Sequence, residues 1–210
     1  MSTQSLAVEA IRVQRLVDLE CAADDRNDVL AGIRRIFRAT AARWPSEPDA
    51  ARAFQDLWLD QYLRHERDLV FAAVGGSDQT PVVVGYLVGC KLNPALSERF
   101  AALGYLQNFA SECARFPAHL HVNIDDGFRG RGIGERLIEA LCERLRAHDV
   151  AGVHVVTGRD QRNVGFYTRI GFSELARTPR GQTEMLFLAR KLHDPAGPNN
   201  LQRNESSHHS

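Results

Sequence analysis

Arg129-Gly130-Arg131-Gly132-Ile133-Gly134 lies between two segments whose apolar residues recur with different periods. Residues 119–125 alternate strictly between polar and apolar side chains, whereas the apolar residues of 135–145 lie three and four positions apart. A period of two that changes to 3.6 across a glycine-rich segment predicts a strand, a tight turn and a helix. Because the first N–H groups of a helix have no internal partner, this turn is also a candidate anion site, and its two arginines favour phosphate.

The composition predicts one domain and excludes several partners. The chain has 210 residues, of which 44% are apolar, enough for one sizeable core. Lys+Arg and Asp+Glu both number 26, so no net charge indicates a nucleic acid or a membrane as partner. No apolar run approaches the ~20 residues of a membrane helix, and the N-terminus lacks the pattern of a signal peptide. Four scattered cysteines form no CxxC pair, so we expect free thiols, no metal site and a cytoplasmic protein.

Before the turn, the pattern predicts a first strand, two helices and a hairpin, over residues 11–14, 29–37, 49–65 and 69–89. Asp28 is the expected N-cap of the first helix. Residues 96–115 have helical spacing that Gly104 interrupts, which predicts one helix or two short ones.

After the turn we expect a helix to about residue 149, then a strand, a short helix and a hairpin, over residues 152–157, 162–170 and 172–192. The turn of this hairpin is predicted at residues 178–181. A strand, a helix and a strand at this spacing imply a parallel crossover. The element order predicts a mixed α/β fold with one domain over residues 8–192. Residues 1–7 and the polar tail 193–210 are predicted to be disordered.

A glycine-rich turn alone would also suit a nucleotide site. A Rossmann turn has the pattern GxGxxG near the start of its domain, whereas this turn lies past the middle of the chain, after three predicted strands. The phosphate-loop pattern GxxxxGKS/T is absent. NAD and ATP are therefore poorer candidates.

Residues 124–134, together with Phe166-Tyr167-Thr168-Arg169-Ile170-Gly171-Phe172, resemble the GNAT N-acetyltransferase superfamily. The resemblance covers about residues 118–176 and rests on two motifs at the expected separation. It implies a GNAT fold, with a mixed, mostly antiparallel central sheet of six to seven strands, flanked by helices, whose central parallel strands splay apart. More narrowly, residues 115–123 look like bacterial GNATs akin to the acetyltransferase-like domain of O-GlcNAcase.

The resemblance implies that acetyl-CoA is the co-substrate and assigns its binding residues. The N–H groups of the turn would hold the pyrophosphate, namely those of Arg129, Gly130, Arg131, Gly132, Ile133 and Gly134. The end of the preceding strand would pair with the pantetheine amides, through Val122, Asn123, Ile124 and Asp125. Tyr167 matches the tyrosine that meets the cofactor sulfur and protonates the leaving thiolate. Two positions depart from the family pattern but are still expected to contact the cofactor, Asp160 in place of Asn and Asn163 in place of Ala.

The base that accepts the amine proton is left open by the sequence. His119, His121, Asn123 and Asp125 share one face of the predicted strand. Either the row lines the acceptor channel, with His121 or Asp125 as catalytic base, or it consists of satisfied polar groups of the core. His154 is expected to be a packed strand residue.

Several other candidate site residues could have a purely structural role in place of the functional role. Tyr167 could be a core aromatic, and the two arginines of the turn could be surface charges. Phe54, Trp58 and Tyr62 share a helical stripe that suits the core, with the acceptor pocket as the second interpretation.

These residues predict an N-acetyltransferase that moves the acetyl group of acetyl-CoA directly to a primary amine of an unidentified small-molecule acceptor. The alternative is a catalytically silent GNAT-fold module that binds CoA or a protein partner. We expect no nucleic acid and no membrane as partner, and a homodimer is the predicted assembly.

Overall fold

The computed structural model describes residues 11–22, 26–76 and 81–193. Of the two tails predicted to be disordered, 1–7 lies outside these residues, and so does 193–210 except for its first residue, His193. Within the described ranges, no helix is long and apolar enough to cross a membrane.

The fold is built on one seven-stranded sheet with the order β1-β2-β3-β4-β5-β7-β6. Every neighbouring pair is antiparallel except β4 and β5, which are parallel. This confirms the predicted mixed α/β class and the parallel crossover. The strands are β1 Arg12–Arg15, β2 Val70–Gly76, β3 Pro81–Cys90, β4 Ala118–Ile124, β5 Gly152–Gly158, β6 Ser173–Arg180 and β7 Thr183–Lys191.

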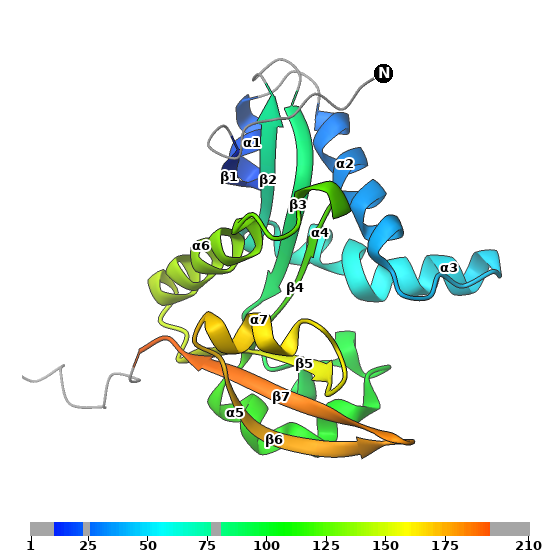
Figure 1. Ribbon diagram of the computed structural model, residues 1–210, viewed down its shortest axis with the longest axis vertical. Coiled ribbons are helices and arrows are strands. Elements are labelled where there is room, and N and C mark those ends of the chain that lie inside the picture. The colour runs from blue at the N-terminus through cyan, green and yellow to red at the C-terminus, as the bar shows by residue number, and fades with distance from the viewer. Residues whose placement is uncertain (1–10, 23–25, 77–80, 194–210) are drawn as a thin grey trace, which may run out of the picture.

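The parallel pair in the middle of the sheet is joined over a very short length. β4 meets β5 only at Ala118 with Val153 and at His119 with His154. Beyond His119 the two strands diverge, while β4 stays paired with β3 as far as Gly85 with Ile124. In Figure 1, β2–β4 and β5–β7 accordingly run in clearly different directions. The splay predicted for this pair is confirmed, and it leaves one edge of β4 without a strand partner.

Helices cover both faces of the sheet, and alternate residues of each strand feed two separate cores. In β2, Val70, Ala72 and Val74 pack into one core, whereas Phe71 and Ala73 pack into the other. The first core is covered by α1 Leu16–Ala22, α2 Arg26–Thr40 and the helical segment 48–65. The second is covered by α6 Ile133–Ala147 and α7 Val164–Arg169.

The helical segment 48–65 is continuous but changes its winding. It consists of α3 Pro48–Gln55, the π-helical turn η2 Asp56–Asp60 and α4 Gln61–His65. It starts at Pro48, one residue before the predicted helix 49–65, because proline fits the first helical turn. None of the residues of α3 is buried, and this helix projects from the body of the molecule (Figure 1).

Three local predictions need correction. α2 begins two residues before Asp28, which therefore lies in the first turn, where its charge still suits the helix dipole. Residues 96–115 form short 3₁₀ turns and one helix, because Asn93 and Pro94 start a tight turn that Gln107 pins through the Ala95 oxygen (2.8 Å). These elements are η4 Pro94–Leu96, η5 Glu98–Phe100, η6 Gly104–Phe109 and α5 Ala110–Arg115.

The third correction concerns the last hairpin. Its strands extend to Arg180 and from Thr183, so the predicted turn at 178–181 lies mostly within β6. Gly181 has a φ of 62° and makes the reversal possible. Two single 3₁₀ turns complete the fold, η3 Arg67–Leu69 and η7 Asp126–Phe128.

Candidate active site

The segment 129–134, here called the glycine turn, connects η7 to α6 in a conformation that needs glycine. Gly130 and Gly132 both have a φ of 73°, while an added Cβ would meet nothing within 4 Å. The backbone conformation therefore requires glycine at both positions, and the space beside them is open. Gly132 is the N-cap of α6 and no side chain caps the helix. The first N–H groups of α6 are thus available to an anion.

A cleft of about 920 Å³, the donor cleft, opens beside this turn. It brings together most of the residues that the family resemblance assigned to the cofactor, namely Val122, Asn123, Ile124, Arg129, Gly130, Gly132, Ile133, Gly134, Asn163 and Tyr167. Arg162 and Arg169 also line it and were not predicted. The free helix N–H groups and the arginines along the cleft fit the phosphates of acetyl-CoA.

Three predicted residues do not line the donor cleft. The Arg131 guanidinium lies 5.1 Å from the centroid of the Phe128 ring. Asp160 accepts a hydrogen bond from the Thr183 hydroxyl (2.8 Å) at the start of β7.

The third, Asp125, is held in place by a neighbouring helix. Its carboxylate accepts a hydrogen bond from Nη1 of Arg35 on α2 (2.6 Å) and a longer one from the N–H of Gly127 (3.4 Å). Arg35 also donates to the Val83 oxygen (3.0 Å). Asp125 therefore ties the chain before the glycine turn to α2 and β3.

The space between the diverging strands forms a second cavity of about 190 Å³, the strand gap. Tyr167 lines both this gap and the donor cleft, so it lies where the two meet. Its ring packs against Phe166 and Phe172, at centroid distances of 5.2 and 5.4 Å. Burial raises the pKa of Tyr167 above its usual value, which keeps the hydroxyl protonated. Within the described chain this hydroxyl has no hydrogen-bond partner and is free to meet a ligand.

Asn163, at the N-terminus of α7, lines the same two cavities. Its side-chain oxygen accepts a hydrogen bond from the Thr157 hydroxyl at the end of β5 (3.0 Å). This bond orients the amide so that its N–H groups remain available to a ligand. Thr157 was not predicted, because it is one more residue in an apolar strand pattern.

The polar row of β4 faces the helical segment 48–65 and α2. The Tyr62 hydroxyl lies 3.0 Å from Nε2 of His119 and 3.2 Å from Nε2 of His121. We call Tyr62, His119 and His121 the histidine bridge. Farther along the row, the Asn123 amide donates to the Tyr86 hydroxyl (2.9 Å). The four polar residues thus each have a specific partner, and two of them, His121 and Asn123, also line the strand gap.

Both imidazoles of the histidine bridge are neutral at neutral pH. Burial lowers the pKa of His121 to about 4. It also lowers the pKa of His119 well below its usual value, with His154 and His121 acting in the same direction. Trp58 packs edge-on against His121, with ring centroids 5.1 Å apart. The stripe of Trp58 and Tyr62 therefore belongs to the core and also contacts the polar row.

His154 is packed in the interior, as predicted, with 1% of its surface exposed. Its Nδ1 donates to the Phe116 oxygen (2.6 Å), and its Nε2 lies 3.9 Å from Sγ of Cys113. Burial raises the pKa of Cys113 to about 12, so this thiol is a poor nucleophile. In the part of the chain that the structure describes, no cluster of His, Cys, Asp or Glu could hold a metal ion.

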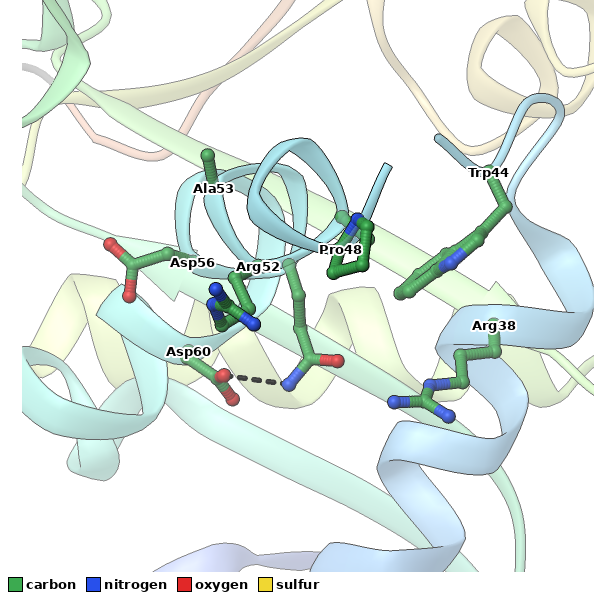
Figure 2. Close-up of a pocket in the computed structure, with 9 residues that line it drawn as sticks. Arg38, Trp44, Pro48, Arg52, Ala53, Asp56 and Asp60 are labelled. Atoms are coloured by element: carbon green, nitrogen blue, oxygen red, sulfur yellow. Dashed lines mark hydrogen bonds between the residues drawn. The ribbon is translucent and has the colours of Figure 1, made fainter. Parts of the chain in front are cut away.

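A separate hollow of about 670 Å³ lies between α2 and the segment 44–60. Figure 2 shows Arg38 and Trp44 at one end of it and Asp56 and Asp60 at the other, where Asp60 accepts a hydrogen bond from Gln55 (2.7 Å). No residue of β4, β5 or the glycine turn lines this hollow. It is therefore distinct from the place where the predicted catalytic groups meet.

Comparison with known proteins agrees with this geometry. Residues 30–172 match the model of the acetyltransferase (GNAT) family. SsHAT has a solved structure that is 24% identical, with a TM-score of 0.65, over 88% of this chain and 100% of that one. The protein yncA from Salmonella typhimurium, solved with its cofactor acetyl-CoA, is 15% identical over 90% of this chain and 98% of its own, with a TM-score of 0.55. The ribosomal-protein-S18-alanine N-acetyltransferase from Escherichia coli is 16% identical over the same shares, with a TM-score of 0.54.

Proposed function

The chain belongs to the acetyltransferase (GNAT) family, and we propose that it transfers an acetyl group directly to the primary amine of a small-molecule acceptor. As a member of that family it is an acyltransferase with acetyl-CoA as co-substrate. The proposal rests above all on the position of Tyr167, where the donor cleft meets the strand gap. At that junction a hydroxyl donor, an unpaired strand edge and a neutral imidazole lie around one space.

On the donor side, the chain supplies contacts for the charged and the amide parts of the cofactor. The first N–H groups of α6 and the Arg129 guanidinium bind the pyrophosphate. The unpaired edge of β4 from Val122 to Ile124 hydrogen-bonds the pantetheine amides as a missing strand would. The free amide of Asn163 adds a donor on the opposite wall. When bound, acetyl-CoA supplies the acetyl group as a thioester.

During transfer, Tyr167 and a base move the two protons. A bond forms between the amine nitrogen and the acetyl carbon, and the bond from that carbon to sulfur breaks. The Tyr167 hydroxyl gives its proton to the leaving thiolate, while the base takes a proton from the amine. The raised pKa of Tyr167 keeps that proton in place until sulfur becomes negatively charged.

Of the two predicted bases, His121 is favoured by its contacts. It lines the strand gap and is uncharged at neutral pH. Asp125 has its carboxylate engaged by Arg35 and the Gly127 N–H, so its part is to position the glycine turn. Asp160 and the side chain of Arg131 do not line the cleft, so their contributions to cofactor binding are indirect.

Calorimetric titration with acetyl-CoA is the first test. We expect saturable binding below millimolar concentration, and its absence would reject the proposal. Release of the CoA thiol is then measured with a panel of amines that covers several classes, namely glucosamine, kanamycin, spermidine, lysine and an alanyl tripeptide.

The base is tested with the amine that reacts fastest in this panel. His121→Gln should lower kcat by roughly 100-fold, the usual contribution of a positioned base, and leave the Kd for acetyl-CoA unchanged. His65→Gln, at an exposed histidine, is the matched control. If Asp125→Asn lowers kcat more than His121→Gln does, Asp125 is the base.

The narrower likeness to bacterial relatives of the acetyltransferase-like domain of O-GlcNAcase stays a prediction, as does the homodimer.

A further inference from the structure

The histidine bridge has a property that follows from counting protons. A hydroxyl carries one proton, so Tyr62 can donate to one imidazole and must accept from the other. Because burial raises the pKa of Tyr62 well above its usual value, the hydroxyl keeps its proton at neutral pH. Each neutral imidazole has one N–H and one bare nitrogen. His119 and His121 must therefore be opposite tautomers: one ring carries its proton on Nε2, and the other carries it on Nδ1.

The proposed role of His121 decides which imidazole accepts. A base needs a bare nitrogen, and Nε2 of His121 already faces the Tyr62 hydroxyl, so the bare nitrogen of His121 is Nδ1. The proton of Tyr62 is then directed at Nε2 of His119, which is bare and accepts it. His119 carries its own proton at Nδ1, which is buried and has no hydrogen-bond partner among the described residues.

His121 takes the opposite form. Its Nε2 carries the proton and donates to the Tyr62 oxygen, which leaves Nδ1 with a lone pair. That Nδ1 has no hydrogen-bond partner among the described residues, and it is not enclosed as Nδ1 of His119 is. The bare nitrogen of His121 is therefore the one that a ligand in the strand gap can reach.

We propose that Tyr62 is a positioning residue, whose hydroxyl holds His121 as the Nε2–H tautomer and so presents Nδ1 as the base. The assignment rests on the proposed role of His121. When His121 accepts a proton at Nδ1, the ring becomes a cation whose Nε2–H bond to the Tyr62 oxygen is charge-assisted and stronger. Tyr62 thus orients the base and stabilises its charged form.

Passing the proton on to His119 would be unfavourable. His119 is buried and faces His154 as well, and both effects lower its pKa well below the usual value. The positive charge therefore stays on His121, and Tyr62 acts by holding it rather than by transmitting a proton.

The helix that carries Tyr62 is shaped for this contact. The π-helical turn 56–60 lies directly before Tyr62 and contains Trp58. Single π-turns within helices occur frequently at functional sites, because the extra residue changes where side chains point. Here Trp58 closes one side of the His121 ring, at 5.1 Å, while Tyr62 bonds its Nε2.

Nitrogen-15 NMR of histidine-labelled protein tests the tautomers without any ligand. At pH 7 we expect His121 as Nε2–H and His119 as Nδ1–H, with the signals assigned through His121→Gln and His119→Gln. The same tautomer in both rings of the unaltered protein would overturn the proposal. In Tyr62→Phe the fixed pattern should give way to mixed tautomers in both rings. Tyr86→Phe removes another buried hydroxyl, on β3, which contacts Asn123 of the polar row, and it should leave both histidine signals unchanged.

A kinetic measurement links the tautomer to the reaction. With the fastest amine of the panel, Tyr62→Phe should lower kcat about 10-fold while the Kd for acetyl-CoA stays within a factor of two. An unchanged kcat would show that Tyr62 does not position the base. Because the NMR experiment uses the protein alone, a failure of acetyl-CoA binding would reject the proposed function and leave the tautomer result intact.

Discussion

The donor side and the acceptor side of this site are built in opposite ways. On the donor side, the strand end, the glycine turn and the start of α6 are consecutive in the chain, and the groups proposed to bind the cofactor are mainly backbone groups. On the acceptor side, the histidine bridge joins side chains 57 and 59 residues apart. A site formed by backbone groups can be recognised in the sequence, because glycines and the period of apolar residues indicate the backbone conformation. A site made of side-chain contacts between distant elements leaves almost none.

The two sides also differ in charge and exposure. Arg129 pairs with Asp126 at the surface and remains more than half exposed. On the acceptor side, His119 is buried and His121 is partly buried, and both imidazoles are uncharged at neutral pH. Ionic strength should therefore affect the donor side, whereas proton concentration should affect the acceptor side.

The largest expected effect is acid destabilisation of the acceptor side. The folded pKa values of His119, His121 and His154 are lowered by burial below the usual 6.5. The unfolded chain therefore binds protons at a higher pH than the folded chain does. The free energy of unfolding is greatest above pH 6.5 and falls as the pH drops toward 4. Each imidazole should contribute a loss of about 2 kcal/mol between pH 7 and pH 5.

Urea unfolding at pH 7, 6 and 5 measures this loss. In His154→Gln the total loss over that interval should shrink by about one third, whatever the variant does to stability at pH 7. His65→Gln, at an exposed position, serves as the control. A free energy of unfolding that is constant from pH 7 to pH 5 would contradict the proposal that these imidazoles are neutral in the fold.

Tyr167→Phe should have the next largest effect, on the reaction alone. Loss of the proton donor is expected to lower kcat by about 100-fold. The Kd for acetyl-CoA should remain nearly unchanged, because the ring still packs against Phe166 and Phe172. Stopped-flow thiol release and calorimetry separate the two quantities. Full activity in this variant would mean that another group, or water, protonates the thiolate.

The same contrast explains what the sequence could predict. The change of period around residues 129–134 correctly predicted the strand, the turn and α6, because each is set by local backbone preferences. The splay of β4 from β5 came from the family resemblance, since strand separation depends on packing across the whole sheet.

Other features could not be predicted, for identifiable physical reasons. Tyr62 falls in an apolar helical stripe and looks like a core residue; its hydroxyl gains a role only because β4 brings two imidazoles to it. The π-helical turn at 56–60 leaves no mark in a pattern that fits an ordinary helix. Residues 96–115 have helical spacing, but Pro94 and the contact of Gln107 with Ala95 impose 3₁₀ turns instead.

The smallest expected effect is a difference in acetyl-CoA binding between variants of the two arginines of the glycine turn. The sequence pattern does not distinguish these arginines. Arg129 lines the donor cleft, whereas Arg131 lies over the Phe128 ring outside it. Arg129→Glu should weaken acetyl-CoA binding by roughly 10-fold, or about 1.4 kcal/mol, and the effect should diminish at high salt. Arg131→Glu should weaken it by less than about 3-fold, since an exposed charge outside the cleft is screened.

Calorimetry at two salt concentrations measures both changes, and Asp126→Asn controls for loss of the ion pair between Arg129 and Asp126. Equal effects of the two reversals would mean that the pyrophosphate senses the total charge of the turn. A dominant effect of Arg129 would mean that one guanidinium contacts it directly. Only the second outcome makes the donor side depend on a particular side chain, as the acceptor side does, and it would narrow the difference between the two halves of the site.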